Sequence, residues 1–427
     1  MDAISQIKKS FPIVAVAEEL GLTVTDKGNG RLFAVCPFHR EKNPSLQLYK
    51  DEGKYHCYGC QAKGDVLDLY GRVQSMSSKE VVSYFMSRLN LNSHALTDKE
   101  KAVRHDQELF FKATNALSDW YGQALNNDAG AKARAYLETR GVDMDAMRLF
   151  RIGFVPEQPA ATFDVLKKAK VPVSKALEWG LLAKSRKTEK LYNPFFGRIV
   201  FPVANAQGIC AFGGRRLNGD GMEKYINSAA NPFFVKSKAF FGLALAEKAI
   251  RETGTVHLVE GFFDVIAMHQ HGFSNTVCCM GTAVSQDQIL TLARLASEII
   301  ILMDGDDPGR KAGLDTATTA AIAGVATKLC RLPTGDDPDE LLRKEGANGL
   351  EDVFVHRVDG LSAVLTELEP KPVEASALVR RILKQRIDPL DRIVQARSIA
   401  SHIGITTERL LQAADFGQEP DAPGNSE

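Results

Sequence analysis

Two pairs of residues that can bind a metal ion lie close together in the N-terminal part of the chain. Cys36 and His39 are separated by two residues, as are Cys57 and Cys60, and 17 residues separate the two pairs. Two close pairs joined by a spacer of hairpin length can supply four nitrogen and sulfur ligands in the tetrahedral geometry that Zn²⁺ prefers. Buried thiols without a metal are the alternative interpretation. The spacing favours a zinc ribbon that binds one structural zinc ion.

The residues around these two pairs fit such a ribbon. We expect strands at residues 45–49 and 54–56, joined by a turn at 51–53. Gly59 is expected to give the second ligand pair the backbone freedom of a tight turn, and His56 to point to the opposite face of its strand from Cys57. Aromatic and basic side chains alternate through the segment, as is typical of surfaces that stack on bases and attract phosphates: Phe33, Phe38, Tyr49, Tyr55, Tyr58, Arg31, Arg40, Lys42, Lys50 and Lys54.

A second set of chemically active residues is a group of carboxylates, each placed at or just after the end of an expected strand. They are Glu260, Asp304, Asp306, Asp337 and Asp339. The carboxyl ends of parallel strands meet at one edge of a sheet, where open α/β sheets bind ligands. Carboxylates crowded at one edge raise each other's pKa, and Mg²⁺ or Mn²⁺ would relieve the repulsion. Gly261 and Gly305 would let backbone or phosphate approach closely.

The alternative for acidic residues at such positions is that they are solvated and favoured by the dipole at a helix N-terminus. We expect this explanation to hold for Asp264, Asp287 and Asp307. For the strand-end set, we expect a metal site.

Charge is strongly segregated along the chain, although its 53 basic and 53 acidic residues cancel. Residues 184–251 contain twelve basic and four acidic side chains, and residues 255–352 contain seven and fifteen, so the segments carry net charges of +8 and −8. Chance clustering is the alternative to a functional arrangement. A basic surface beside a magnesium-binding edge indicates phosphoryl or nucleotidyl transfer on a nucleic acid.

The order of expected elements divides the chain into several domains of α+β and α/β class. A zinc-ribbon domain at 1–92 and a polar linker at 93–106 precede a mixed α+β basic domain at 107–250. Short apolar runs alternate with helical segments over 251–350, which predicts a parallel sheet covered by helices. A short helical subdomain at 351–414 and a disordered tail at 415–427 complete the organisation.

Composition excludes several classes of protein. No apolar run reaches the ~20 residues of a membrane helix, and the N-terminus lacks the pattern of a secretory signal. Seven cysteines in such a chain indicate reduced thiols or a metal site, so we expect a cytoplasmic protein without a membrane partner. The four cysteines outside the ribbon are expected to be inert core thiols: Cys210, Cys278, Cys279 and Cys330.

These motifs, in this order over residues 1–415, resemble those of bacterial DnaG-type DNA primases. The first unit looks like that family's CHC2 zinc-binding domain, and the acidic unit looks like a TOPRIM domain. The sequences Val259-Glu-Gly-Phe-Phe-Asp264 and Asp304-Gly-Asp306 match TOPRIM signatures, and Asp337 and Asp339 match its later acidic pair. The middle resembles the N-terminal half of the primase core, where the family's motifs contain or flank Arg198, Arg215, Lys224, Tyr225, Asn227 and Lys236.

The resemblance implies synthesis of RNA primers on single-stranded DNA from NTPs. Two or more Mg²⁺ or Mn²⁺ ions would bind the carboxylates, and the basic and polar residues would hold template, primer and nucleotide. Whether Glu260 binds metal or serves as a general acid or base stays open. We expect a monomer without the family's usual C-terminal helicase-binding domain, which leaves a helicase partner open.

Three features depart from the family pattern. These are that missing domain, Ala229-Ala230 where a Pro-acidic pair is expected, and a slightly short segment before Cys36. Two alternatives to a primase are a TOPRIM-type nuclease and a catalytically silent DNA-binding adaptor of a mobile element. A type I topoisomerase is disfavoured, because no tyrosine context indicates a nucleophile.

Overall fold

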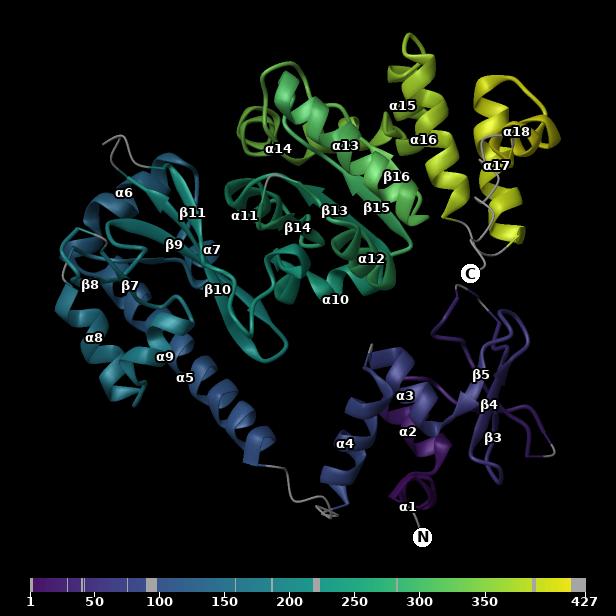
Figure 1. Ribbon diagram of the computed structural model, residues 1–427, viewed down its shortest axis with the longest axis horizontal. Coiled ribbons are helices and arrows are strands. Elements are labelled where there is room, and N and C mark those ends of the chain that lie inside the picture. The colour runs from purple at the N-terminus through teal and green to yellow at the C-terminus, as the bar shows by residue number, and fades with distance from the viewer. Residues whose placement is uncertain are drawn as a thin grey trace, which may run out of the picture. The chain divides into compact units, whose positions relative to one another are not determined.

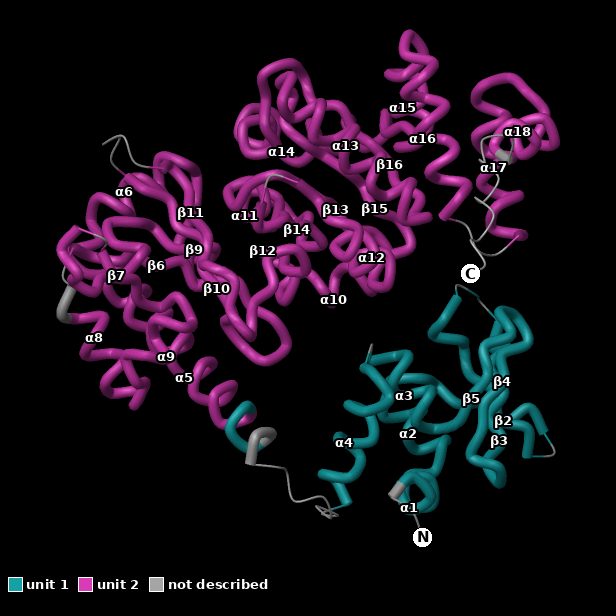
Figure 2. The backbone as a smooth tube through the Cα atoms, viewed as in Figure 1, with its two compact units in different colours: residues 1–103 teal, residues 104–427 magenta. Residues whose placement is uncertain are grey.

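The structure is a computed structural model that divides into two compact units, residues 1–103 and 104–427 (Figure 2). It describes residues 3–28, 30–39, 41, 43–74, 76–89, 98–157, 159–185, 187–217, 223–281, 283–385 and 389–415. Apart from Asp415, the predicted tail at 415–427 lies outside the described residues. None of the described helices has the length and apolar character needed to cross a membrane.

The first unit is a five-stranded antiparallel sheet whose strands follow each other in chain order. The strands are β1 (Thr25–Asp26), β2 (Leu32–Ala34), β3 (Leu46–Tyr49), β4 (Lys54–Cys57) and β5 (Lys63–Asp65). Its helices are α1 (Ala3–Ser10), α2 (Ile13–Glu19), α3 (Val66–Gln74) and α4 (Ser78–Arg88). One face of the β3–β4 pair buries Leu46, Leu48 and Tyr55 in a core shared with Phe85 of α4.

A long helix, α5 (Asp98–Asn126), occupies most of the segment that the sequence predicts to be a linker. The boundary between the two units, at 103/104, falls inside the linker predicted at 93–106, but the segment is helical from residue 98 onward. Residues 93–97 lie outside the described part. The first turns have no apolar periodicity, but charged residues with high helix propensity need no core contact to continue a packed helix. Arg104 pairs with Glu108 one turn later at 3.1 Å, and Lys175 reaches Asp106 at 2.7 Å.

The α+β half of the second unit is built on a four-stranded antiparallel sheet in the order β11-β10-β9-β6. The long strands β9 (Arg198–Asn205) and β10 (Gly208–Arg216) form a hairpin. The other two strands of this sheet are β6 (Gly153–Phe154) and β11 (Tyr225–Asn227), and β7 (Ala183–Lys184) and β8 (Leu191–Tyr192) form a separate two-stranded sheet. The helices after α5 are α6 (Ala131–Thr139), α7 (Met144–Leu149), α8 (Pro159–Lys168), α9 (Val173–Glu178) and two 3₁₀ turns, η1 (Asp128–Gly130) and η2 (Lys236–Lys238).

The α/β half contains a six-stranded sheet in the order β12-β14-β13-β15-β16-β17, parallel except at its two edges. Figure 1 labels its four central strands, β13 to β16. The strands are β12 (Phe240–Phe241), β13 (Thr255–Val259), β14 (Thr276–Cys279), β15 (Glu298–Ile301), β16 (Thr327–Leu329) and β17 (Val358–Asp359). The predicted parallel sheet is thus confirmed, with strands that end before the carboxylates. Glu260 and Asp304 therefore lie in the loops that follow β13 and β15.

Alternating residues of β13 divide the core between the two faces of this sheet. Val256 and Leu258 pack with α10 (Leu243–Thr253), α12 (Gln286–Leu295), α13 (Asp307–Ala323) and α15 (Gly360–Glu367). Val259 packs in the other core, with α11 (Phe262–Gln270), α14 (Pro338–Val355) and the neighbouring antiparallel sheet. Phe201 of β9 stacks on Phe262 of α11 with ring centroids 4.9 Å apart. The two halves of this unit therefore share one apolar core, which fixes the loops between them.

The segment predicted as a short helical subdomain contains the helices α16 (Pro372–Lys384), α17 (Pro389–Ile403) and α18 (Thr407–Asp415). Their apolar residues form a small core with Ala321 and Ile322 of α13 and Leu365 of α15. They extend the α/β half on the side of α13.

Candidate functional site

The four predicted zinc ligands come together in the first unit. The ligand atoms of Cys36, His39, Cys57 and Cys60 all lie within 4.8 Å of one another. The sulfur atoms of Cys36 and Cys60 are 3.8 Å apart, as are Sγ of Cys57 and Nδ1 of His39. Zinc–sulfur bonds of about 2.3 Å separate tetrahedral ligands by roughly this distance. The residues thus fit one zinc ion.

Glu41, which the sequence does not mark as a functional residue, orients the histidine of this site. Oε2 of Glu41 lies 3.2 Å from Nε2 of His39, while Nδ1 of His39 faces the thiols. The other oxygen, Oε1, accepts hydrogen bonds from the amides of Cys36 at 2.8 Å and Ser45 at 3.0 Å. A carboxylate behind a metal-binding histidine is a common way to fix the ring and its tautomer. One acidic residue two positions after a ligand gives no signal in the sequence.

Gly59 serves the ribbon differently from what the sequence predicts. Its φ is not positive; in this knuckle the positive φ belongs to Gln61, at 61°. A Cβ at position 59 would instead lie 2.4 Å from Nε2 of His39, so glycine is needed to leave room for the ring. The predicted orientation of His56 is confirmed, because its ring lies outside the ligand group and Nε2 lies 3.2 Å from Oε1 of Gln61.

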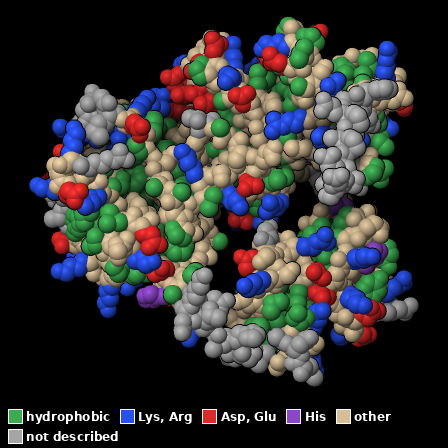
Figure 3. Space-filling view, viewed as in Figure 1, with side chains coloured by type: hydrophobic (Ala, Val, Ile, Leu, Met, Phe, Trp, Pro, Cys, Tyr) green, Lys and Arg blue, Asp and Glu red, His purple; other side chains and the backbone are tan. Residues whose placement is uncertain are grey.

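In the second unit, a cavity of about 530 Å³ brings the acidic and basic residues together. It lies where the loops after β13 and β15 face the edge of the β10–β11 pair. Its acidic wall contains Glu260, Asp264, Asp304 and Asp337, and its basic and polar wall contains Arg140, Arg215, Lys224, Tyr225, Asn227 and Lys236. Acidic and basic side chains also lie next to each other on the surface around α14 (Figure 3).

Asp304 and Glu260 form the centre of the acidic wall. Oε1 of Glu260 accepts a hydrogen bond of 3.2 Å from the backbone amide of Asp304. Burial raises the pKa of Asp304 to about 7, with further increases from the charges of Glu260 and Asp337. Oδ1 of Asp304 is buried and has no hydrogen-bond partner among the described residues. An orphaned carboxylate oxygen among other carboxylates suits a divalent cation.

Asp306 and Asp337 each cap the helix that follows them. Asp306 accepts a 2.8 Å hydrogen bond from the amide of Gly309, and Asp337 accepts one of 2.6 Å from the amide of Glu340. Gly305 permits the close backbone approach that the sequence predicts, since a Cβ there would lie 2.0 Å from a backbone oxygen of the loop after β16. Among the described residues, the zinc ligands are the only group of three or more that could hold a metal ion as they stand, and the carboxylates of the acidic wall do not form such a group.

Asp264 lies in the first turn of α11, as predicted, but it is not solvated, and that part of the prediction is wrong. Its side chain is 6% exposed, accepts a 2.9 Å hydrogen bond from the amide of Gly261 and lines the cavity. Burial raises its pKa well above the usual range, and Asp337 and Asp304 raise it further. The side chain is buried because α11 packs into the core shared by both halves, which local sequence does not reveal.

Asp339 lies outside the acidic wall, although the sequence predicts it as a metal ligand beside Asp337. The side chain is 2% exposed and pairs with Arg140 at 2.5 Å and Arg343 at 3.2 Å. Arg343 lies one turn after Asp339 on the same helix, α14, whereas Arg140 comes from the end of α6, which the Asp337-Pro-Asp339 pattern gives no reason to place there.

Five of the six predicted nucleic-acid or nucleotide residues line the cavity. The guanidinium of Arg215 lies 4.7 Å from the ring centroid of Tyr136 and donates a hydrogen bond to the hydroxyl of Tyr225. The amide nitrogen of Asn227 donates to the carbonyl of Met280 at 2.6 Å. Arg198 is the exception: it is buried and donates to the carbonyl of Lys224 at 3.3 Å, so it supports the basic wall from behind.

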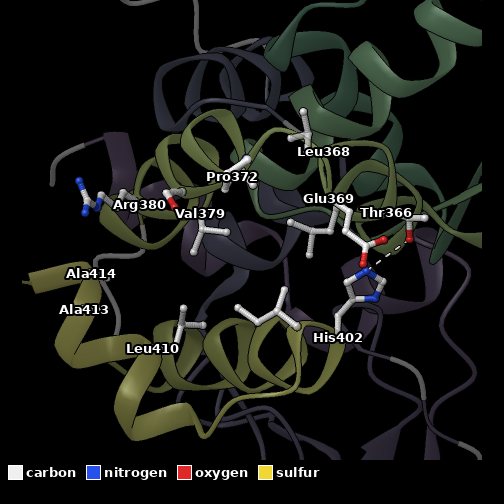
Figure 4. Close-up of a pocket in the computed structure, with 14 residues that line it drawn as sticks. Thr366, Leu368, Glu369, Pro372, Val379, Arg380, His402, Leu410, Ala413 and Ala414 are labelled. Carbon is white, nitrogen blue, oxygen red and sulfur yellow. Dashed lines mark hydrogen bonds between the residues drawn. The ribbon is translucent and has the colours of Figure 1, made fainter.

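Another cavity, of about 600 Å³, lies among α15–α18 (Figure 4). It is lined mainly by apolar side chains such as Val379 and Leu410. Its polar lining includes His402, whose ring nitrogen lies 3.4 Å from the hydroxyl of Thr366. This lining provides no cluster of ligands or reactive groups, so we place the chemistry in the cavity of mixed charge.

The fold and the two sites define a zinc-ribbon protein with a cavity of mixed charge at the carboxyl edge of a mainly parallel α/β sheet. Residues 1–101 match the family model described as CHC2 zinc finger, 120–247 match the DNA primase catalytic core, N-terminal domain, and 257–342 match the Toprim-like model.

Curated relatives carry the same domains. The chain is 34% identical to the DNA primase of Halalkalibacterium halodurans, over 81% of this chain and 58% of that protein. It is 32% identical to the DNA primase of Deinococcus radiodurans, over 91% of this chain and 68% of that protein. The chain therefore spans about three fifths to two thirds of the length of these relatives.

Solved structures of primases are also similar to this chain. The zinc-binding and RNA polymerase domains of Aquifex aeolicus primase match with a TM-score of 0.62 and 28% identity, over 96% of this chain and 99% of that one. A DnaG primase catalytic domain bound to single-stranded DNA matches with a TM-score of 0.63 and 29% identity, over 72% of this chain and 99% of that domain. The chain belongs to the bacterial DnaG-type DNA primase family, whose members are DNA-directed RNA polymerases.

Proposed function

We propose that this chain synthesises short RNA primers on single-stranded DNA. The observation that carries the proposal is the single cavity with a carboxylate wall facing a basic wall. Such a cavity can hold a nucleoside triphosphate with its cations on one side and a nucleic-acid strand on the other. The similarity to a primase domain bound to single-stranded DNA supports that template.

Two divalent cations, Mg²⁺ or Mn²⁺, would be held by Glu260, Asp304, Asp306 and Asp337. Bound there, they would lower the barrier to attack of the primer 3′-hydroxyl on the α-phosphate, with release of pyrophosphate. Arg215 and Tyr225 are held together by their hydrogen bond and present a rigid cationic surface to phosphate. Lys224 and Lys236 add mobile positive charge at the cavity wall.

The zinc ribbon would engage the template. Tyr58 is 54% exposed, and its hydroxyl contacts Tyr49 and Gln47 at 3.1 Å each, so an aromatic surface with polar edges is available for bases. NTPs and the growing primer complete the set of ligands. We propose a monomer, because one chain contains both walls of the cavity.

One assay separates this function from its alternatives. The protein is incubated with single-stranded DNA, labelled NTPs and Mg²⁺, and both the RNA and the DNA are resolved by size. New short RNA supports a primase, shortened DNA indicates a nuclease, and a shifted band without new products indicates a DNA-binding adaptor. Asp304→Asn is the matched variant, because it removes one charge at almost constant volume and should abolish synthesis.

A further inference from the structure

The acidic pair of the Asp337-Pro-Asp339 segment is split between two environments. Asp337 lines the cavity, whereas the carboxylate of Asp339 is almost fully buried against arginines. Its Oδ2 lies 2.5 Å from Nη2 of Arg140 and 3.3 Å from Nη2 of Arg343, and its Oδ1 lies 3.2 Å from Nε of Arg343. Both oxygens contact an arginine, so the charge of Asp339 is balanced by arginines.

Arg140 connects this buried pair to the cavity. It lies at the C-terminal end of α6, and its guanidinium carbon is 4.5 Å from the ring centroid of Phe263. The same side chain lines the cavity opposite Glu260 and Asp304. Its buried Nε has no hydrogen-bond partner in the described part of the chain. Burial would lower the pKa of Arg140, but the contact with Asp339 outweighs it and keeps the guanidinium charged.

A guanidinium fixed in this way is suited to phosphate. Arginine offers five donors in a planar array, and holding one edge with a carboxylate orients the remaining donors. The aromatic face of Phe263 limits rotation of the group. Since Asp339 occupies only one edge of the guanidinium, other donors can reach an oxyanion in the cavity.

We propose that Asp339 is a positioning residue that holds Arg140 toward a phosphate group in the cavity, and that it is not a metal ligand. The proposal rests on the primer-synthesis function, because the phosphate belongs either to the incoming nucleotide or to the nucleic-acid strand. It assigns the two acids of one short motif to different tasks: Asp337 faces the cations and Asp339 faces the arginine.

Direct measurement of Mn²⁺ binding separates positioning from metal binding. Mn²⁺ is titrated by electron paramagnetic resonance into the wild-type protein, Asp339→Asn and Asp304→Asn, with no substrate present. We expect Asp339→Asn to keep wild-type stoichiometry and an affinity within about twofold, while Asp304→Asn loses affinity strongly. Loss of Mn²⁺ binding in Asp339→Asn to the extent seen in Asp304→Asn would overturn the proposal.

Kinetics then locate the phosphate. Asp339→Asn and Arg140→Gln should each raise the KM for NTP, or the Kd for single-stranded DNA, by roughly tenfold, the scale of one charge-assisted hydrogen bond. The double variant should be no worse than Arg140→Gln, because the two residues act as one unit. A rise in KM places the phosphate on the nucleotide and a rise in Kd places it on the strand. Multiplying effects in the double variant would refute the coupling.

Two controls keep these results separate from misfolding and from failure of the proposed function. Arg140→Lys keeps a charge beside Asp339 but removes the planar donor array. This variant should bind Mn²⁺ normally and still raise KM or Kd, and unchanged values of both would contradict the role of Arg140. If Asp339→Asn does not fold, Arg140→Lys takes its place in the kinetic measurements. Absence of primer synthesis in the wild-type protein would refute the function itself, whereas the Mn²⁺ titration needs no turnover.

Discussion

Divalent-cation binding to the acidic wall should depend steeply on pH, because the wall holds protons at neutral pH. Burial, Glu260 and Asp337 raise the pKa of Asp304 to about 7, and Asp264 is raised well above its usual range. A cation needs the carboxylate form, so a proton must leave when it binds. For a group with a pKa of about 7, the apparent affinity for Mg²⁺ should fall about tenfold from pH 8 to pH 6. About half a proton should be released per site at pH 7.

Isothermal titration of Mg²⁺ in two buffers with different ionisation enthalpies measures both quantities. Because the carboxylates are coupled, the released protons belong to the cluster and not to one residue. Asp304→Asn is the matched variant: it removes the titrating group and should bind Mg²⁺ weakly, with a much smaller dependence on pH. An affinity in the wild-type protein that is constant between pH 6 and pH 8, with no proton release, would refute the geometry and the electrostatics together.

Three further predictions concern the ribbon, the sheet and the basic wall. Glu41→Gln should weaken zinc binding by about 10- to 100-fold, because His39 loses the carboxylate that orients its ring. Competition with a chromophoric chelator measures the zinc affinity. Glu52→Gln, which changes an exposed acid of the same unit, should have no effect. His257 is 6% exposed, stacks on a phenylalanine ring at 4.6 Å, and has its pKa lowered by burial to about 4. On acidification, the histidine is therefore protonated in the unfolded chain at a higher pH than in the folded protein. Lowering the pH from 7.5 to 5 should reduce the free energy of unfolding of the wild-type protein by about 2 kcal/mol more than that of His257→Phe. Urea unfolding of both proteins at the two pH values measures this difference, which would be absent if the residue were solvated. Lys224→Ala should weaken binding to single-stranded DNA and should reduce the slope of the logarithm of the binding constant against the logarithm of salt concentration by about one. Lys248→Ala, on an exposed helix face, should change neither quantity, and fluorescence anisotropy titrations measure both.

Local signals in the sequence predict much of this fold. Ser77 with Glu80 and Ser285 with Gln288 form the two capping boxes that mark the starts of α4 and α12. The apolar runs of the acidic segment become the parallel strands, and the spacing of the cysteine and histidine pairs locates the zinc site. Each of these signals operates over a few residues, where side-chain chemistry and backbone geometry are directly linked.

The features that sequence analysis misses depend on residues far apart in the chain. The partner of Asp339 is Arg140, which lies 199 positions away. Asp264 is buried by a core that two sheets share, so its pattern alone suggests an ordinary acid at a helix start. The first turns of α5 are polar and charged, and neither composition nor periodicity separates such a helix from a linker. Burial and pairing decide all three cases, and both follow from the tertiary structure.

The chemical identity of the product tests the proposed primase function most directly. Wild-type protein, single-stranded DNA, NTPs and Mg²⁺ are incubated without any primer, and the product is analysed by mass spectrometry. We expect short RNA chains that carry a 5′-triphosphate and are complementary to the template, and no such chains from Asp304→Asn with an unchanged circular-dichroism spectrum. Absence of RNA from the folded, zinc-loaded wild-type protein, or RNA made equally well by the variant, would contradict the central claim.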